Sequence, residues 1–232
     1  MKLFAFVVFT SACFAQVDLS GAWAPSRATG PSAPAPPTPI LLKAPYKAAY
    51  DELQAKIRAA SARGEQYAVK GLCSPYGVPT MMTVASYPAE IIQTPKQITI
   101  VTEAFSEVRR IFMGKTQTPI DDVPPGYYGR SVGRWDKDTL VVDTVGIKTT
   151  APGYQNMPHS DQMRITERFR RPTPETLHDQ ITIEDPITLE QPVTYTLVFR
   201  LLADYEMVEF VCDNNREYID ENNIVRLKLH DK

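Results

Sequence analysis

Alternation of apolar and polar side chains with a period of two dominates the chain from residue 79 onward. The clearest run is 193–201, whose apolar side consists of Val193, Tyr195, Leu197, Phe199 and Leu201. Such alternation is typical of a strand with one buried and one solvated face. About ten runs of this kind, separated by short turns, predict an antiparallel β-barrel or a strongly curved sheet.

The first fifteen residues have the composition of an export signal. Lys2 precedes an apolar run from Leu3 to Phe9, and small residues follow up to Ala15. The run is too short to span a membrane, so we expect cleavage after Ala15 and a periplasmic or secreted mature protein. A lipid anchor on Cys13 is the alternative, although the residues before Cys13 lack the leucine usual in that motif.

The length of the chain suits one domain. It has 232 residues, 43% of them hydrophobic, which is enough for a single sizeable core. Residues 16–44 supply a first strand and a proline-rich extended segment, and apolar side chains at helical spacing predict one helix from Tyr46 to Ala62. We expect a mainly β fold. It would be a single lipocalin-like antiparallel β-barrel within residues 45–232, with one N-terminal helix packed outside it.

The charge of the chain argues against a nucleic-acid partner. Lys and Arg number 25 against 27 Asp and Glu, which gives a formal net charge of −2, and no dense basic cluster lies along the chain. No further segment approaches the length of a transmembrane span. The predicted partner is therefore a small molecule, and the sequence leaves the oligomeric state open.

Export would leave Cys73 and Cys212 together in an oxidising compartment. Such a pair can form a disulfide that closes a long loop. Cys212 also alternates with Val208 and Phe210, so a buried free thiol is the alternative. We favour the disulfide, because neither cysteine has a neighbouring base or the C-x-x-C spacing of a zinc site.

Two resemblances bear on the fold. Gly21-Ala22-Trp23 resembles the opening G-x-W signature of lipocalins and other calycins, in which the tryptophan plugs the closed end of the barrel and a late arginine packs on it. This resemblance implies that Arg226 takes that part here. The order of CSPYGVP, GRSVGRWDKDTLVVDTVG and PHSDQMRITERF along the chain is similar to that in a large family of exported bacterial proteins. It implies the fold and export, and no particular reaction.

Carboxylates interrupt the apolar sides of the predicted strands. Glu167 lies between Ile165 and Phe169, and Asp143 and Asp179 occupy similar positions, although both sides of the Asp143 strand are apolar. A carboxylate that faces a core must be ion-paired, protonated or functional. The sequence leaves open whether Glu167 is a catalytic group or half of a structural ion pair.

Interior arginines would be the partners in the structural case. Arg110 and Arg134 share their strand sides with apolar residues, so both are predicted to face the interior. Several interior charges also fit a polar, ligand-binding lumen, which would raise the pKa of a carboxyl. Tyr128 and Trp135 complete the predicted binding residues, since the glycines near them would let a ligand approach closely. Bulges that help to close a barrel explain those glycines equally well.

His159 lies in a loop rich in proline, glycine and asparagine that leads into the strand of Glu167. At the rim of a barrel it could form an acid–base pair with Glu167. The alternative is a loop histidine that only caps the strand. Together with Asp143 these residues could offer three metal ligands, but scattered histidines predict no metal site, and we expect no cofactor.

Three functions fit these features. The first is an enzyme of the lyase, hydratase or isomerase type, in which His159, Glu167 and Asp143 transfer protons on a small, partly apolar or aromatic substrate. The second is a non-catalytic, lipocalin-like binder or carrier of a small hydrophobic ligand. The third is a structural protein whose interior charges are all ion-paired.

Overall fold

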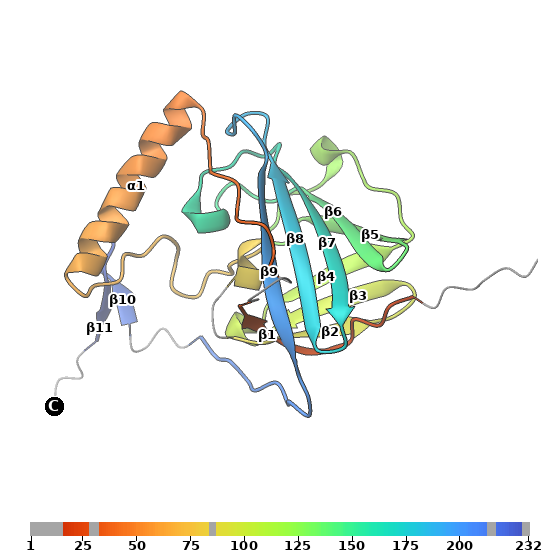
Figure 1. Cartoon of the computed structure of the whole chain (residues 1–232). Coiled ribbons are helices and arrows are strands. Elements are labelled where there is room, and N and C mark those ends of the chain that lie inside the picture. The colour runs from red at the N-terminus through yellow and green to blue at the C-terminus, as the bar shows by residue number, and fades with distance from the viewer. Residues whose placement is uncertain (1–15, 28–32, 84–86, 213–216, 229–232) are drawn as a thin grey trace, which may run out of the picture.

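The computed structural model describes residues 16–27, 33–83, 87–212 and 217–228. The predicted signal, its cleavage site and Cys13 lie outside the described residues. The main body is a closed barrel of nine strands in chain order, with the helix α1 and a two-stranded sheet beside it (Figure 1). The predicted barrel with an external helix is therefore confirmed.

The elements, with short 3-10 segments labelled η, follow in this order: β1 Gly21–Ser26, α1 Ala44–Ala62, η2 Thr80–Thr83, β2 Ala89–Gln93, β3 Gln97–Thr102, η3 Ala104–Ser106, β4 Val108–Met113, η4 Ile120–Asp122, β5 Arg130–Asp136, β6 Thr139–Val145, η5 Tyr154–Asn156, β7 Arg164–Thr173, β8 Thr176–Glu184, β9 Val193–Leu202, β10 Glu217–Ile219 and β11 Val225–Leu227.

The barrel closes where β1 pairs with β9, with Trp23 opposite Leu201. Neighbouring strands are antiparallel except β4 and β5, which run parallel, with Ile111 opposite Ser131. This departs from the predicted all-antiparallel arrangement. The connection 114–129 is long enough to return the chain to the other end of the barrel before β5 begins, and a tight hairpin could not do this.

The tryptophan of the G-x-W motif, Trp23, lies in the barrel interior, where β1 pairs with β9. Trp23 is 1% exposed, and its indole nitrogen donates a hydrogen bond of 2.9 Å to the carbonyl of Leu19. The arginine that packs on it is Arg171 of β7, whose guanidinium lies 5.2 Å from the ring centroid. The expectation for Arg226 is therefore wrong. Arg226 lies in β11, where it pairs with Glu65 and Asp220.

Helix α1 stands beside the barrel and next to β10 and β11 (Figure 1). It begins at Ala44, two residues before the predicted start, with a proline in its first turn. The predicted disulfide is confirmed, since Cys73 and Cys212 are bonded with their Cα atoms 5.6 Å apart. The alternation noted for Val208, Phe210 and Cys212 does not mark a strand here, because residues 207–212 form no ladder. The disulfide fixes this segment instead.

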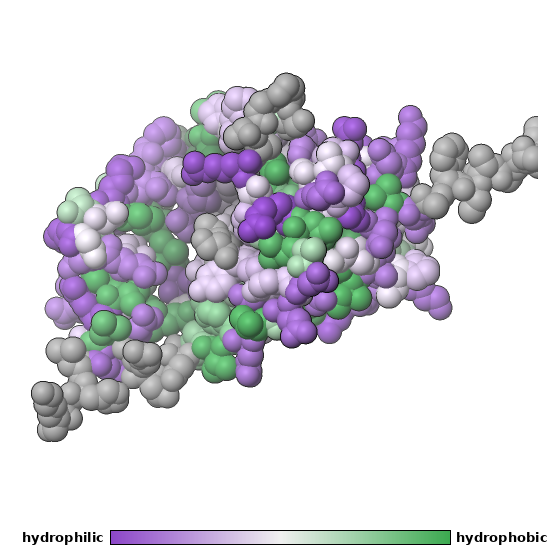
Figure 2. Space-filling model, turned by 60° about the horizontal axis from the view of Figure 1, so that its bottom comes forward, coloured by the Kyte–Doolittle hydropathy of each residue, from purple (hydrophilic) through white to green (hydrophobic). Residues whose placement is uncertain are grey.

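The helices among the described residues are all too short or too polar to cross a membrane. Apolar side chains form separate patches among hydrophilic ones on the face shown in Figure 2.

Candidate functional site

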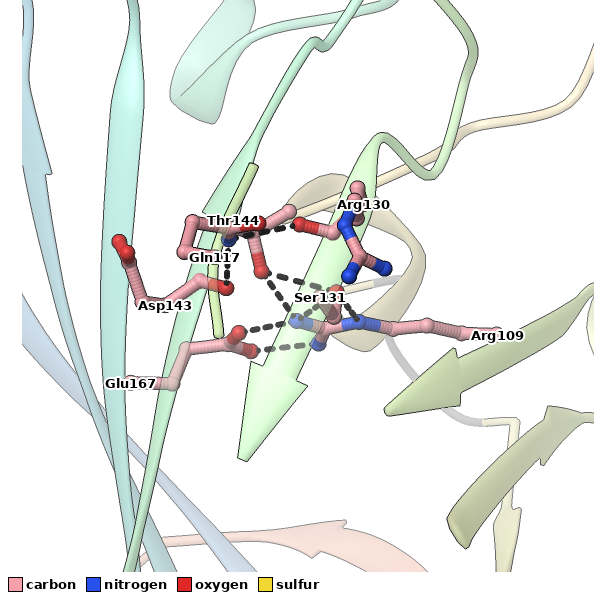
Figure 3. A network of polar contacts seen from close by, with 7 residues as sticks. All are labelled: Arg109, Gln117, Arg130, Ser131, Asp143, Thr144 and Glu167. Atoms are coloured by element: carbon pink, nitrogen blue, oxygen red, sulfur yellow. Dashed lines mark hydrogen bonds and ion pairs between the residues drawn. The ribbon is translucent and has the colours of Figure 1, made fainter. Parts of the chain in front are cut away.

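The central feature of the barrel interior is an ion pair between Arg109 of β4 and Glu167 of β7. Both side chains are 0% exposed. Their strands alternate so that Arg109 shares the inner face with Ile111, and Glu167 shares it with Ile165 and Phe169. Both guanidinium amino groups donate to Glu167, Nη1 at 2.7 Å from Oε1 and Nη2 to Oε2 (Figure 3).

Two hydroxyl groups complete the hydrogen bonding of Arg109. Ser131 of β5 accepts from Nε and Nη2 at 3.1 Å, and Thr144 of β6 accepts from Nη2 at 2.9 Å. Burial disfavours the charge on Arg109, but the charge and hydrogen bonds of Glu167 outweigh this, so the pKa of the guanidinium is raised. A buried pair offsets its desolvation only when its remaining groups find hydrogen-bond partners, and here each guanidinium nitrogen has at least one. This pair needs no ligand to explain it.

Asp179 of β8 is different. It is 0% exposed, and neither carboxyl oxygen has a hydrogen-bond partner among the described residues. Its strand places it on the inner face, directly opposite Phe169 of β7 on one side and Leu197 of β9 on the other. Its direct neighbours on the two adjacent strands are therefore both apolar.

Two polar side chains lie diagonally across from Asp179. Ile181, two residues along β8, pairs with Glu167 on β7 and with Tyr195 on β9. Diagonal neighbours on one face of a sheet are within reach of long side chains. The Tyr195 hydroxyl is also buried and has no hydrogen-bond partner among the described residues. Asp179 and Tyr195 thus place two unpartnered polar groups in one part of the interior.

Burial and the neighbouring charges favour the neutral form of both groups. Burial, and then the charge of Glu167, raise the pKa of Asp179 well above its ordinary value, with Arg109 acting in the opposite direction. Burial, followed by the charges of Asp179 and Glu167, likewise raises the pKa of Tyr195 well above its ordinary value. The neutral form of each group, which this environment favours, carries an O–H that can donate a hydrogen bond.

The end of the barrel above Tyr195 is covered by the loop that contains η5. Tyr154 of this loop stacks on the ring of Tyr195, with ring centroids 3.8 Å apart and planes 10° from parallel. Ile147, Ala151 and Met157 of the same loop belong to the buried core. The stacking holds the Tyr195 ring in one orientation, with its hydroxyl in the interior.

A groove opens beside β9, where β1 leaves the barrel wall. β1 pairs with β9 only from Leu202 to Val198, and the proline-rich segment follows the rest of β9, with the Thr38 amide bonded to the Thr194 carbonyl at 2.9 Å (Figure 1). The groove has a volume of about 430 Å³. Its lining includes residues 33–37, together with Met82, Leu197 and Phe199. Leu197 is the direct neighbour of Asp179, so the groove reaches the wall of the unpartnered site.

The three residues predicted to transfer protons lie in different places. Glu167 is in the interior as predicted, held by Arg109. Asp143 points outward from β6, away from that pair (Figure 3), and binds Arg164 of β7 at 2.9 Å. The outward position corrects the inner face considered for Asp143. The burial of Val141 on the outer face explains why the strand is apolar on both sides.

His159 is buried in the loop before β7. Its Nε2 lies 3.0 Å from the carbonyl of Ala151 and its Nδ1 lies 3.2 Å from that of Ser160. The next residue, Ser160, binds Asp185 through its amide and its hydroxyl, at 2.6 and 2.8 Å. The PHSD motif therefore ties this loop to the loop after β8. These contacts fit the alternative of a loop histidine.

The arginines predicted to face inward face outward. Arg110 and Arg134 are both exposed. On β4 the true inner residue is the neighbouring Arg109, and on β5 the inner residues are Ser131 and Gly133. Both sides of β4 carry apolar side chains, so alternation alone did not determine which arginine was buried.

The predicted binding aromatics do not meet at one site. Trp135 is half-buried at the far end of β5 and packs against the core. Tyr128 hydrogen-bonds to Glu107, and burial, followed by that carboxylate, raises the pKa of Tyr128. Glu107 also accepts the amide N–H groups of Tyr76 and Gly77, at 2.6 and 2.8 Å. Tyr128 thus belongs to a saturated structural cluster.

Sequence reasoning missed Arg109 and the role of Tyr195. Tyr195 was placed correctly on the inner face, but a tyrosine among apolar residues gives no sign that its hydroxyl lacks a partner. Within the part of the chain described, no group of three or more His, Cys, Asp or Glu side chains is placed to hold a metal ion. Comparisons with protein families, characterised proteins and solved structures found no match.

Proposed function

We propose that this protein is an exported binder of a small molecule, held in the barrel interior at Asp179 and Tyr195. The observation that carries the proposal is the wholly buried carboxyl of Asp179, neither oxygen of which has a hydrogen-bond partner among the described residues. An unsatisfied buried polar group costs about 1–3 kcal/mol, and native proteins contain few of them. A ligand that hydrogen-bonds to Asp179 would remove that cost.

The contacts of the predicted acid–base residues favour binding over catalysis. A general base needs a free lone pair directed at the substrate. Both oxygens of Glu167 accept from Arg109, and both ring nitrogens of His159 face backbone carbonyls. Asp143 lies on the outer face, away from the interior, where its Oδ2 binds Arg164. We therefore propose a carrier and not a lyase, hydratase or isomerase that uses these residues.

Export is part of the same proposal. A disulfide is stable in an oxidising compartment, and the chain forms one between Cys73 and Cys212. The apolar run from Leu3 to Phe9 has the pattern of an export signal. Both features support a periplasmic or secreted site of action.

Binding can be tested with the neutral fluorophore N-phenyl-1-naphthylamine. We expect a saturable rise in its fluorescence with one site per chain. Leu197→Trp, which fills the groove next to Asp179, should abolish the rise, whereas Gln180→Trp, on the exposed outer face of β8, should leave it unchanged. Native mass spectrometry of the protein isolated without denaturation would show any bound molecule. No fluorescence rise and no bound molecule would support the structural alternative instead.

A further inference from the structure

We propose that the ligand is a neutral, mostly apolar molecule with a carbonyl-type hydrogen-bond acceptor, which enters through the groove beside β9 and is held by the hydroxyl groups of Asp179 and Tyr195. This inference rests on the proposed function and adds the chemical class of the ligand and its route. It is argued from three features: the unpartnered groups, the charge of the interior and the position of the groove.

The unpartnered groups are matched to an acceptor. In their neutral forms, Asp179 and Tyr195 each have one O–H to donate. Neither donates to a protein atom among the described residues. Two donors on one inner face can both bind the lone pairs of one carbonyl oxygen. An apolar ligand without an acceptor would leave both donors unsatisfied and would therefore bind less tightly than a ligand with an acceptor.

The charge of the interior favours a neutral ligand. Arg109 and Glu167 compensate each other through two hydrogen bonds, and Arg109 also donates to Ser131 and Thr144. No unpaired basic group therefore remains in this network for an anionic ligand. A buried charge without a partner costs several kcal/mol, so a carboxylate or an ammonium ion would bind weakly.

The groove provides the route and the apolar contacts. Residues 196–199 of β9 line it, and one of them, Leu197, lies directly opposite Asp179 on the neighbouring strand. Directly opposite residues have Cβ atoms only about 4.5–5.5 Å apart. A molecule lying on Leu197, with Met82 and the proline-rich segment around it, would have its acceptor one side chain away from Asp179. A groove of about 430 Å³ is within the size range of small-molecule sites.

Three naphthalenes of similar size test the chemical class. 2-Acetylnaphthalene carries a carbonyl acceptor, 2-ethylnaphthalene carries none, and 2-naphthoate is an anion. The measured quantity is the dissociation constant of 2-ethylnaphthalene divided by that of 2-acetylnaphthalene. The two ligands differ in solubility, but this difference is the same for every variant and cancels when the ratio is compared between proteins. We expect Asp179→Leu and Tyr195→Phe to lower this ratio by about 10- to 100-fold when combined, the value of two hydrogen bonds.

Matched controls separate recognition from folding. Gln180→Leu makes the same kind of change on the outer face of β8 and should leave the ratio unchanged. Asp179→Asn keeps the volume and a donor at position 179, so it should retain part of the preference if the leucine variant does not fold. The infrared C=O band of bound 2-acetylnaphthalene should lie at lower wavenumber in the wild type than in Asp179→Leu. Ala35→Trp, in the exposed proline-rich wall of the groove, should weaken binding of the ketone about 10-fold or more.

The outcomes that overturn the inference are distinct. Binding of both neutral naphthalenes with an unchanged ratio in the variants would refute acceptor recognition and leave the binding function intact. Tighter binding of 2-naphthoate than of the ketone would refute the neutral ligand. Unchanged ketone binding in Ala35→Trp would refute the route. If the three naphthalenes and N-phenyl-1-naphthylamine all fail to bind, the proposed function falls together with the inference.

Discussion

The pH dependence of stability should reveal the proton on Asp179. Replacing this residue with asparagine keeps its size and its neutral form, but removes its ionisation. In the folded protein, burial and the neighbouring charge of Glu167 raise the pKa of Asp179 well above its ordinary value, against the opposing effect of Arg109. In the unfolded chain the same carboxyl titrates at about 3.9.

The sign of the effect follows from where the proton is held. Above the unfolded-state pKa the unfolded chain has released the proton while the folded chain keeps it. Unfolding then releases a proton, so the free energy of unfolding falls as pH rises. The contribution of Asp179 is most favourable below about pH 4 and is lost progressively until the pH reaches the folded-state pKa.

The slope has a defined size. One proton corresponds to about 1.4 kcal/mol per pH unit, so the wild type should lose about this much stability relative to Asp179→Asn for each pH unit between the unfolded-state and the folded-state pKa of Asp179. For a chain of 232 residues this equals a fall in melting temperature of about 3–6 °C per pH unit. The pH at which the loss stops reports the folded-state pKa itself.

Urea unfolding, monitored by tryptophan fluorescence, can measure this difference. Trp23 is fully buried, so its fluorescence should change when unfolding exposes the ring to water. Both proteins are titrated at each pH from about 4.5 to 8. Other titrating groups are common to both proteins and cancel in the comparison. Asp143→Asn serves as the control, since it removes a surface ion pair that is worth no more than about 1 kcal/mol. Parallel curves for the wild type and Asp179→Asn would refute a protonated Asp179.

Three other predictions concern stability. Glu167→Gln should lower the free energy of unfolding by about 3–5 kcal/mol in urea denaturation, because it leaves the charge of Arg109 buried and uncompensated; a loss below about 1 kcal/mol would contradict this account. Replacing Cys73 and Cys212 together by serine should cost about 2–5 kcal/mol, measured as a lower melting temperature, since the bond closes a loop with a sequence separation of 139. Arg171→Ala should cost about 0.5–2 kcal/mol through the lost cation–π contact with the ring of Trp23, and Arg171→Lys should restore part of it in the same denaturation assay.

The period-two pattern was enough to predict the barrel, because each strand has one face that must be buried. It placed Tyr195 and Glu167 on the inner face, and it flagged Asp179 as a carboxyl on an apolar side. It also failed in a regular way. Where both faces of a strand carry apolar residues, as in β4 and β6, alternation cannot choose between them, so it points to Arg110 instead of Arg109 and to an inward Asp143.

Other features depend on long-range contacts that no local pattern encodes. The arginine on Trp23 comes from β7 and not from the last segment, because the register of β7 in the closed barrel brings Arg171 to that end. The segment 207–212 alternates like a strand but has no neighbour to pair with and is fixed by Cys212. That Asp179 and Tyr195 have no hydrogen-bond partner for these oxygens among the described residues follows only from the positions of the neighbouring atoms.

Glu167 and Asp179 lead to different conclusions about function, although in the sequence both are carboxylates on the apolar side of a strand. Arg109 and Glu167 form an ion pair, and Arg109 also donates hydrogen bonds to Ser131 and Thr144, so their burial is explained by the fold alone. A leucine at position 179 would fill nearly the same space among Phe169 and Leu197 without an unsatisfied group. We therefore expect Asp179→Leu to raise the free energy of unfolding by about 1–3 kcal/mol while it weakens binding of 2-acetylnaphthalene. A gain in stability joined to a loss of binding would identify Asp179 as a residue that serves a ligand, whereas a loss of stability would mean that this carboxyl supports the fold.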